Sequence, residues 1–293
     1  MDINKLIHIN KLKFDNFYCE ILEAKLDKSF LSKAMKYSSL KGGKRIRAFL
    51  VSESSKIVNL NQKNSMIIAS SIESIHSYSL IHDDLPSMDN DDFRRGKPST
   101  HKKFGEAAAI LAGDALHDFA FQLLSGSLTK INEIKHLELI NYLTLCTGYQ
   151  GLAGGQSLDL LYENKIINTG KIVDMYNKKT GSLFEFSFAA PFIIKGETAK
   201  RIQFSKNYGS LFGTLFQISD DFIDEVNSFK EIGKTPGKDK KQGKRTLLSV
   251  IGKTRVKNYS IEIIESFIKK NKKEFLNNPI LRALLYYNVE RLK

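Results

Sequence analysis

The sequence predicts an all-α protein folded as a single domain over residues 1–293. Apolar residues recur with the 3.6-residue period of helices over long segments, and the chain contains only five prolines. No tract rich in Pro, Ser and Gly and no internal repeat divides it. Because 42% of the residues are hydrophobic, the chain can bury a sizeable core.

The composition limits the compartment and the partners. The formal charge is +13, but the lysines are scattered, without the clustering or motif of a nucleic-acid-binding protein. No uncharged apolar run reaches the ~18 residues of a membrane span, and the N-terminus lacks a signal-peptide core. Cys19 and Cys146 have no metal-ligand spacing, which suits a reducing compartment. We therefore expect a cytoplasmic protein with no nucleic-acid partner and no membrane insertion.

The first basic cluster, Lys41 to Arg47, reads KGGKRIR. Its two glycines let the backbone approach a ligand closely. Lys44, Arg45 and Arg47 bring positive charge to an expected helix start, where free N–H groups favour anions. An anion-binding site and a basic helix cap both fit this pattern.

The segment from Ser71 to His101 carries the first acidic cluster. An apolar helix should end at Asp83 and Asp84, because Pro86 disfavours helical geometry just before it. Further aspartates and two arginines follow, namely Asp89, Asp91, Asp92, Arg94 and Arg95. Carboxylates crowded at the negative end of a helix dipole repel one another, so a cation is expected to compensate them. Their oxygens suit Mg2+, and arginines bind phosphate oxygens, whereas a solvated acidic loop is the ordinary alternative.

Two later segments are rich in small residues. Phe104 to Leu124 predicts a closely packed helix that contributes to the core and to a dimer surface, and its Asp114 is expected to satisfy a cap or a neighbouring lysine. Gly151 to Asp159, which reads GLAGGQSLD, places Gln156 and Asp159 one helical turn apart. Close approach to a ligand and polar capping fit this second segment equally well.

Lys179 and Thr180 lie in an expected amphipathic helix. Lys179 follows Ile172 by seven residues and therefore falls near the buried stripe. A lysine in that position needs an anionic partner.

The second acidic cluster lies between Gly213 and Asp224, in GTLFQISDDFID. At about 100° per residue, one helical stripe contains four polar side chains, those of Gln217, Asp220, Asp221 and Asp224. Apolar residues flank this stripe, and an inward face cannot keep uncompensated charge, so metal is again the expected partner. The two clusters together suggest a metal cluster gripped from opposite walls.

The remaining basic residues lie near the C-terminus. Glu225 to Leu247 is rich in Gly and Lys, which fits either a flexible surface loop or a lid that carries Lys234 and Lys238 over phosphates. Arg291 and Lys293 end the last helix, where fraying is the ordinary expectation.

In combination, IHDDLPSMDNDDFRRGKPSTH and FQISDDFID resemble the two aspartate-rich motifs of the trans-isoprenyl diphosphate synthases. Four residues separate Asp84 from Asp89, a spacing similar to that of bacterial farnesyl diphosphate synthases and plant-type geranylgeranyl enzymes. Further motifs follow in the family's order across nearly the whole chain. The chain departs from the family at Ala48, where proline is common, and at Leu247 and Leu248, where an aromatic and a proline are frequent.

The resemblance implies an isoprenoid-synthase fold, a bundle of roughly ten or more helices around a central active-site cavity. It implies a homodimeric prenyltransferase that condenses isopentenyl diphosphate with dimethylallyl and geranyl diphosphates, with Mg2+ bridging the allylic diphosphate and both aspartate motifs. The implied catalytic residues are Asp83, Asp84, Lys179, Asp220 and Asp221, and the implied metal ligands are Asp83, Asp84, Asp89, Asp220 and Asp224. Isopentenyl diphosphate would bind to Lys44, Arg47, His76 and Arg95, and the allylic diphosphate to Arg94, Lys179, Thr180, Gln217 and Lys234. The resemblance also offers an alternative to fraying of the C-terminus, in which Arg291 and Lys293 close over the isopentenyl diphosphate site as basic tails do in relatives.

Product length is assigned by resemblance to Tyr78 and Ser79. An aromatic five residues before the first aspartate forms the pocket floor in bacterial farnesyl enzymes, and Tyr78 has that position relative to Asp83. Helix geometry alone places it about 140° away from Asp83, so a half-buried core tyrosine is the alternative. With Tyr78 as the floor, the expected main product is C15 farnesyl diphosphate.

Three alternatives remain from the sequence. A geranylgeranyl diphosphate synthase would keep the chemistry and change the product length. A terpene cyclase would not need KGGKRIR, because it binds no second diphosphate. A non-catalytic subunit of a heteromeric synthase usually loses aspartates that this chain retains.

Overall fold

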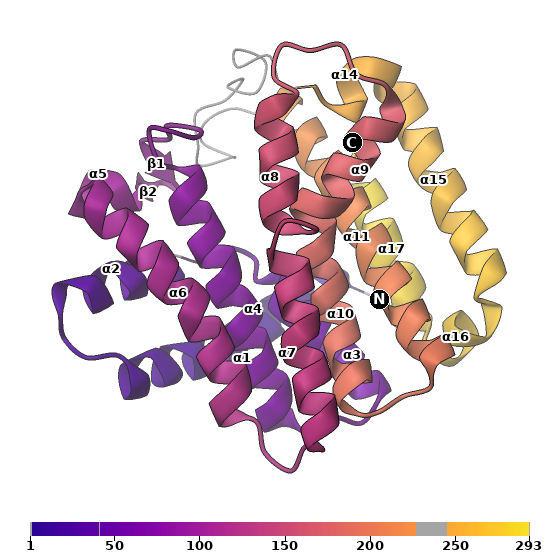
Figure 1. Ribbon diagram of the computed structural model, residues 1–293. Coiled ribbons are helices and arrows are strands. Elements are labelled where there is room, and N and C mark those ends of the chain that lie inside the picture. Colours follow the sequence, from indigo (N-terminus) through magenta and orange to yellow (C-terminus); the bar gives the residue numbers. More distant parts are fainter. Residues whose placement is uncertain (1, 41, 227–244, 293) are drawn as a thin grey trace.

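The computed structural model describes residues 2–40, 42–226 and 245–292, which are almost entirely helical (Figure 1). In chain order the helices are α1 (Ile3–Lys25), α2 (Phe30–Ser39), α3 (Ile46–Ile57), α4 (Gln62–Asp83), α5 (Thr100–Phe104), α6 (Glu106–Ser127), α7 (Glu133–Thr147), α8 (Leu152–Leu161), α9 (Thr169–Tyr176), the π-helix η1 (Asn177–Gly181), α10 (Ser182–Ile194), α11 (Ala199–Val226), α14 (Leu247–Ile251), α15 (Lys253–Lys270), α16 (Lys272–Asn277) and α17 (Pro279–Glu290). The strands β1 (Phe93–Arg94) and β2 (Lys97–Pro98) pair as an antiparallel hairpin. The all-α prediction is confirmed, whereas Lys234, Lys238 and Lys293 lie outside the described residues.

Local sequence signals account for the ends of the main helices. The side chain of Asp2 caps the start of α1 by accepting a hydrogen bond from the Lys5 amide, and Asn61 caps α4 in the same way. Helix α4 ends at Asp83, close before Pro86, as the sequence predicts.

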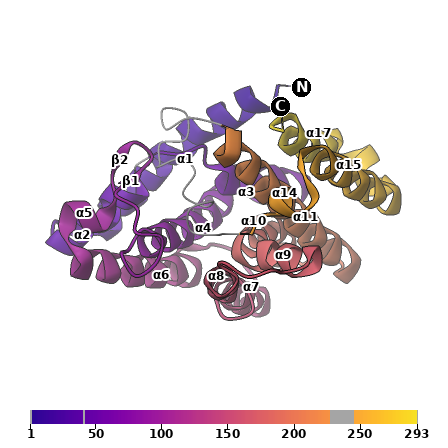
Figure 2. The ribbon, with the colours of Figure 1, turned by 90° about the horizontal axis from the view of Figure 1, so that it is seen from above.

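Helices α4 and α10 form the centre of the molecule (Figure 2). Both are buried on nearly every side, which is the pattern of core helices. Helix α4 packs against α3 and α6, and α10 packs against α3, α7 and α11. Side chains of α10 enter two core clusters, Phe186 on one side and Phe184 and Phe188 on the other. One helix thus joins the two halves of the core.

Helix α6 is the one described helix that is long and apolar enough, by length and composition, to cross a membrane. Within its apolar window 44% is buried inside the structure, and it packs along α4. A core helix of a soluble protein has the same properties, so this observation is weak evidence for a membrane span.

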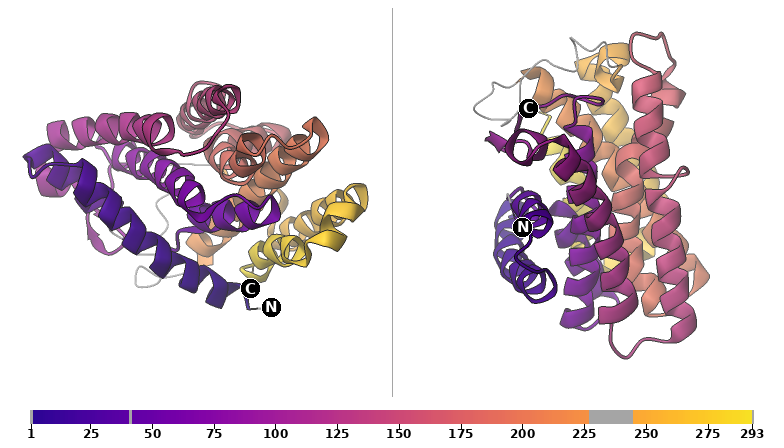
Figure 3. Two further views of the ribbon diagram at one scale, coloured as in Figure 1. Left: turned by 90° about the horizontal axis from the view of Figure 1, so that it is seen from below. Right: turned by 60° about the vertical axis from the view of Figure 1, so that its left-hand side comes forward.

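The two acidic helix ends lie at the same end of the bundle. The hairpin β1–β2 follows α4 and α14 follows α11, and Figure 1 shows both at that end. The N- and C-terminal helices α1 and α17 contact each other, and Figures 1 and 3 show the C-terminal end of the chain nearer to the acidic end of the bundle than the N-terminal end. This arrangement places the C-terminal helix within reach of the acidic end.

Candidate active site

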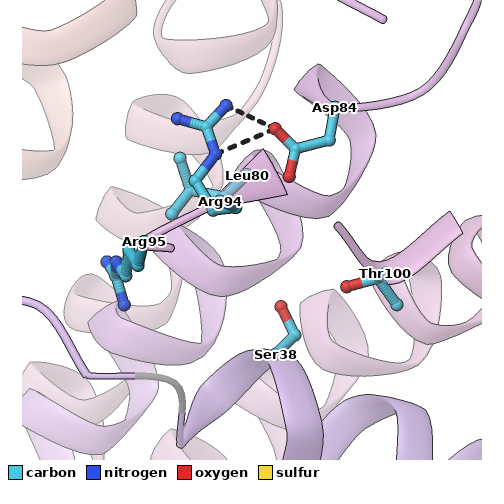
Figure 4. Close-up of a pocket in the computed structure, with 6 residues that line it drawn as sticks. All are labelled: Ser38, Leu80, Asp84, Arg94, Arg95 and Thr100. Carbon is cyan, nitrogen blue, oxygen red and sulfur yellow. Dashed lines mark hydrogen bonds and ion pairs between the residues drawn. The ribbon is translucent and has the colours of Figure 1, made fainter. Parts of the chain in front are cut away.

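Asp84 ends helix α4 and is ion-paired in the structure. It is 2% exposed, and Arg94 donates to its Oδ1 through Nε at 2.9 Å and also through Nη2 (Figure 4). Arg94 further donates to Asp91 Oδ2 at 3.2 Å. Burial alone would lower the pKa of Arg94, but Asp84 and Asp91 raise it. The first acidic cluster is therefore partly compensated by an arginine from the hairpin.

In the first acidic cluster, burial disfavours the ionised form of the Asp83 carboxyl group. Burial raises the pKa of this carboxyl to about 6, and nearby Asp89 raises the pKa further, while Lys179 acts in the opposite direction. A carboxyl with a raised pKa has less compensation than ionisation requires. The position of Asp83 is therefore one at which a cation would be stabilised.

The side chains of the adjacent hairpin residues Arg94 and Arg95 point in different directions and contact different partners. The turn residues Arg95 and Gly96 of the hairpin have positive φ angles of 55° and 72°. Arg94 reaches Asp84, whereas Arg95 donates to the Gly42 carbonyl and lies 3.4 Å from His76 Nε2. Figure 4 shows the two guanidinium groups turned to different sides.

The KGGKRIR segment approaches Arg95 closely. A Cβ atom added at Gly43 would lie 2.7 Å from Arg95 Cζ, so only glycine fits beside the guanidinium. The sequence predicted that this backbone approaches a ligand closely, and the group that lies against Gly43 in the structure is the guanidinium of Arg95.

Four predicted residues, Lys44, Arg47, His76 and Arg95, form a basic cluster. Burial lowers the pKa of Arg47 and of Arg95 to about 10, and also lowers the pKa of His76, with further lowering by Arg47 and Arg95. Desolvation, with Arg291 next, lowers the pKa of Lys44. Arg47 Nε has no hydrogen-bond partner within the part of the chain that the structure describes. Mutually repelling, desolvated cations are the environment that an anion would stabilise.

Arg45 does not join this cluster, so its expected role in anion binding is wrong. As the residue before α3 it has a positive φ of 55°, and its side chain is buried. It donates to Asp15 Oδ1 at 2.8 Å, to Glu73 Oε2 at 3.1 Å and to the Ser39 carbonyl at 2.6 Å. The left-handed cap turns this arginine into the protein while Lys44 and Arg47 face the other way along the same segment.

Lys179 lies in the π-helix η1 and has the anionic partner that its position requires. Its Nζ lies 2.6 Å from Asp159 Oδ2 on α8. A Cβ atom at Gly155 would lie 2.1 Å from Lys179 N, so the glycine permits this contact between α8 and η1. Both amide atoms of Gln156 are buried without a hydrogen-bond partner among the described residues. Close packing against η1 therefore accounts for Gly155, whereas Cβ atoms at Gly151 and Gly154 would meet the backbone of Cys146 and Tyr149.

The second acidic cluster is held by a chain of hydrogen bonds. Thr180 Oγ1 donates to Gln217 Oε1 at 2.6 Å, and Gln217 Nε2 donates to Asp221 Oδ1 at 2.7 Å. The Tyr176 hydroxyl donates to Asp221 and accepts from the Leu247 amide at 2.9 Å. Asp221 thus ties α11 to α9 and α14. The predicted stripe on α11 is present as one face of the helix.

Arg291, the C-cap residue of α17, has contacts on the acidic helix α11 in the structure. It pairs with Asp220, and its guanidinium lies over the Phe216 ring, with Cζ 4.6 Å from the centroid. Its Nε and Nη1 have no hydrogen-bond partner among the described residues. The ion pair and the ring contact anchor the end of α17 between Asp220 and Lys44.

The acidic and basic clusters lie within electrostatic reach of one another. Lys179 influences the pKa of Asp83, and Asp220 influences the pKa values of Lys44 and Arg47. Within residues 2–40, 42–226 and 245–292, no three His, Cys, Asp or Glu side chains converge to hold a metal ion by themselves. The donors are nevertheless carboxylate oxygens, and Mg2+ commonly uses one or two carboxylates with water and phosphate oxygens. The residues present therefore fit a Mg2+ site completed by a phosphorylated ligand.

Tyr78 and Ser79 lie on α4, one turn before the acidic end. The Tyr78 ring is half-buried and contacts His82 and His117 edge-to-face, with centroid distances of 5.2 and 5.3 Å. Burial raises the pKa of Tyr78, and Asp83 and Asp114 raise it further. Ser79 Oγ donates to the His76 carbonyl at 3.0 Å. Tyr78 therefore lies on the side of α4 that packs against α6.

Sequence reasoning missed several features of the site. The RRGK segment contains a glycine at a two-residue turn, a signal that could have predicted the hairpin. The π-helix around Lys179 and the role of Tyr176 had no such signal, because both depend on contacts with α8, α11 and α14.

Comparisons with known proteins agree over most of the chain. Residues 28–279 match the family described as Polyprenyl synthetase. The chain is 39% identical over 266 residues to the farnesyl diphosphate synthase of Micrococcus luteus, with 90% of each protein covered. It is 41% identical over 247 residues to geranylgeranyl pyrophosphate synthase 4 of Arabidopsis thaliana, which covers 83% of this chain and 64% of that relative. A crystal structure of a geranyltransferase from Helicobacter pylori, complexed with magnesium and isoprenyl diphosphate, has a TM-score of 0.83 at 30% identity and covers 100% of this chain and 98% of its own. The predicted fold is confirmed by this likeness.

Proposed function

The chain belongs to the polyprenyl synthetase family as a short-chain prenyltransferase, and from this membership we propose that its main product is farnesyl diphosphate. It condenses isopentenyl diphosphate first with dimethylallyl diphosphate and then with geranyl diphosphate, and each step releases diphosphate. The observation that carries the proposal is the pair of adjacent clusters, one acidic around Asp83 and Asp220 and one basic around Arg47 and Arg95. A terpene cyclase would need the acidic cluster but not the basic one, because it binds no second diphosphate.

The acidic cluster is the proposed metal site. The carboxylates that would hold Mg2+ are Asp83, Asp84, Asp89, Asp220 and Asp224. When bound, Mg2+ neutralises charge on the leaving diphosphate. Release of Asp84 from Arg94 and of Asp220 from Arg291 would free two arginines for phosphate oxygens.

The allylic diphosphate is bound beside this metal site. Its proposed protein ligands are Arg94, Lys179, Thr180 and Gln217, together with Lys234 outside the described residues. Catalytic roles fall to Asp83, Asp84, Lys179, Asp220 and Asp221, with Asp221 acting through its bonds to Tyr176 and Gln217. Breakage of the C–O bond leaves an allylic carbocation, which a water-free apolar pocket protects from hydrolysis.

Isopentenyl diphosphate is bound by the basic cluster of Lys44, Arg47, His76 and Arg95. Its double bond attacks the allylic carbocation, and a new C–C bond forms. The resulting tertiary carbocation loses one proton to the released diphosphate, which restores a double bond in the product. His76 accepts a hydrogen bond from Arg95 and has a lowered pKa, so it contributes as a neutral group.

Product length, in this proposal, is limited by Tyr78 with Ser79 beside it. Each round adds five carbons to the tail of the allylic chain, and a bulky ring beyond the first aspartate motif leaves no room after C15. Tyr78→Ala should accordingly lengthen the product.

We further propose a single-domain cytoplasmic enzyme that acts as a homodimer, without nucleic-acid partners or membrane insertion. Large apolar side chains are exposed on α6 and α7, where Ile110, Leu111, Ile134 and Leu137 are 44%, 55%, 66% and 68% exposed. Figure 1 shows these two helices next to each other on the outside of the bundle, where a second copy could cover them.

Removal of one carboxylate from either wall tests the proposed site. Asp83→Ala and, separately, Asp220→Ala should each lower turnover by at least ~100-fold, because a group that stabilises transition-state charge is lost. The assay is condensation of labelled isopentenyl diphosphate with dimethylallyl diphosphate and Mg2+. Glu262→Ala, which removes an exposed carboxylate on α15, is the control. Near-normal turnover in both variants would refute the two-walled site.

A further inference from the structure

Tyr78 lies within a row of four rings between α4 and α6. Its ring meets His82 at 5.2 Å and 87° and His117 at 5.3 Å and 81°. His117 in turn contacts Phe121 at 5.1 Å. Tyr78 is thus gripped edge-to-face from two sides, once from its own helix and once from α6.

The inner ring of this row, that of His82, is fixed in place. Its Nε2 lies 3.0 Å from the carbonyl oxygen of Ile110, so this nitrogen carries the proton and donates it. A Cβ atom at Gly113 would lie 2.1 Å from the same nitrogen, so the imidazole occupies the space left by the missing side chain. Because both contacts come from α6, His82 cannot yield without moving that helix.

The outer ring, that of His117, lies at the edge of the protein. Its side chain is 37% exposed, and its Nδ1 lies 3.4 Å from Asp118 Oδ1. Tyr78 lies deeper and is within electrostatic reach of Asp83. His117 therefore stands behind Tyr78 as seen from the first acidic cluster, where the head of the allylic substrate would bind.

We propose that His117 is a positioning residue for product length, which holds the Tyr78 ring across the path of the growing prenyl tail. The inference rests on the proposed function and on Tyr78 as the stop. A tyrosine ring without neighbours can change rotamer, and a growing apolar tail would push it aside. Edge-to-face contacts with His82 and His117 oppose that rotation. His82 packs into α6 and lies next to Asp83, so its replacement would disturb the acidic site. The contact between Tyr78 and His117 can be removed without that disturbance.

The test is the product distribution of His117→Ala in the wild-type and in the Tyr78→Ala background. His117→Ala alone should raise the ratio of C20 to C15 product by about 2- to 10-fold, the scale of one aromatic contact, while the rate of the first condensation stays unchanged. His117→Phe, which keeps a ring, should restore the wild-type ratio. Gln122→Ala, an exposed position on the same helix, is the control for unspecific changes in α6.

The double variant distinguishes positioning from an independent wall. If His117 acts through Tyr78, then His117→Ala adds nothing in the Tyr78→Ala background. An equal shift in both backgrounds, or no shift in the wild-type background, would overturn the inference. Unchanged product length in Tyr78→Ala would overturn it as well. Absence of any condensation by the wild-type protein would instead refute the proposed function.

Discussion

At the scale of single residues, the site holds charges that work against folding. Asp83 is partly buried near Asp89, and Arg47, His76 and Arg95 are desolvated near one another. Each of these groups would be stabilised by a ligand of opposite charge, the carboxyl by a metal ion and the basic groups by a diphosphate. The protein without ligands therefore carries a stability cost that its ligands remove.

The cost at Asp83 can be measured as a function of pH. Its pKa is about 6 in the folded protein and 3.8 ordinarily, so the folded state binds the proton more tightly. Stability from this group is present below the unfolded-state pKa and is lost as the pH rises through the interval up to about 6. Because the Asp83 side chain is partly exposed, solvent screens part of this effect, and we expect the free energy of unfolding to fall by about 1–2 kcal/mol over this pH interval.

Asp83→Asn should therefore raise the free energy of unfolding at pH 7 by that amount in the presence of EDTA, and change it little at pH 4. Urea titrations at the two pH values measure this difference. Asp118→Asn, at an exposed carboxylate, should show no comparable gain. A variant less stable than wild type at pH 7 would contradict the assignment of an uncompensated charge to Asp83.

Residue roles were predictable where residue type and spacing determine them. The aspartate clusters and the need of Lys179 for an anionic partner follow from helical spacing. The structure supplies Asp159 as a partner of Lys179, which spacing did not predict, since the resemblance had assigned Lys179 to the allylic diphosphate. Within KGGKRIR, spacing could not separate Lys44 and Arg47 from Arg45, because one positive φ angle decides which way each side chain points. The pairing of Arg291 with Asp220 was not predicted, because the two residues are distant in the sequence.

At the scale of elements, Arg45 joins three helices. It precedes α3 and pairs with Asp15 on α1 and with Glu73 on α4. This joint holds the helix that carries Arg47 against the helix that carries His76 and Asp83. The long helices α4 and α11 were predictable from periodicity and from the positions of proline. The π-helix η1 was not, because its extra residue per turn depends on packing against α8 and α11.

Arg45→Met should destabilise the protein by about 3 kcal/mol or more, because Glu73 is left buried without its main partner. Lys44→Met, one residue earlier, should leave stability nearly unchanged and instead raise the KM for isopentenyl diphosphate. Thermal unfolding and steady-state kinetics on both variants separate the two roles. Equal effects of the two changes on stability would contradict this division within the segment.

At the scale of the whole molecule, the helical bundle brings its acidic helix ends and its C-terminal helix to one end and leaves an apolar surface on α6 and α7 (Figure 3). Composition predicted the class of fold, and the small-residue segment predicted that α6 serves both core and surface. The sequence alone could not predict which apolar residues of α6 and α7 remain exposed, because this depends on which face each helix packs against the rest of the bundle.

Charges placed on this surface should separate the proposed dimer. Ile134→Glu combined with Leu137→Glu puts two acids at side chains that are 66% and 68% exposed, so the monomer fold should persist. Sedimentation velocity should show a dimer for wild type and a monomer for the variant. Ile166→Glu, at a 95% exposed position away from α6 and α7, should remain dimeric. A dimeric double variant would place the interface elsewhere, and a monomeric wild type would refute the homodimer.

The central claim is that two diphosphates bind side by side and are condensed to C15. Product analysis of the purified wild-type protein, supplied with dimethylallyl diphosphate, labelled isopentenyl diphosphate and Mg2+, tests it most directly. We predict mainly farnesyl diphosphate, with all condensation lost in EDTA. Mainly C20 or longer products would keep the chemistry and contradict Tyr78 as the stop, and no condensation by the folded protein would contradict the account as a whole.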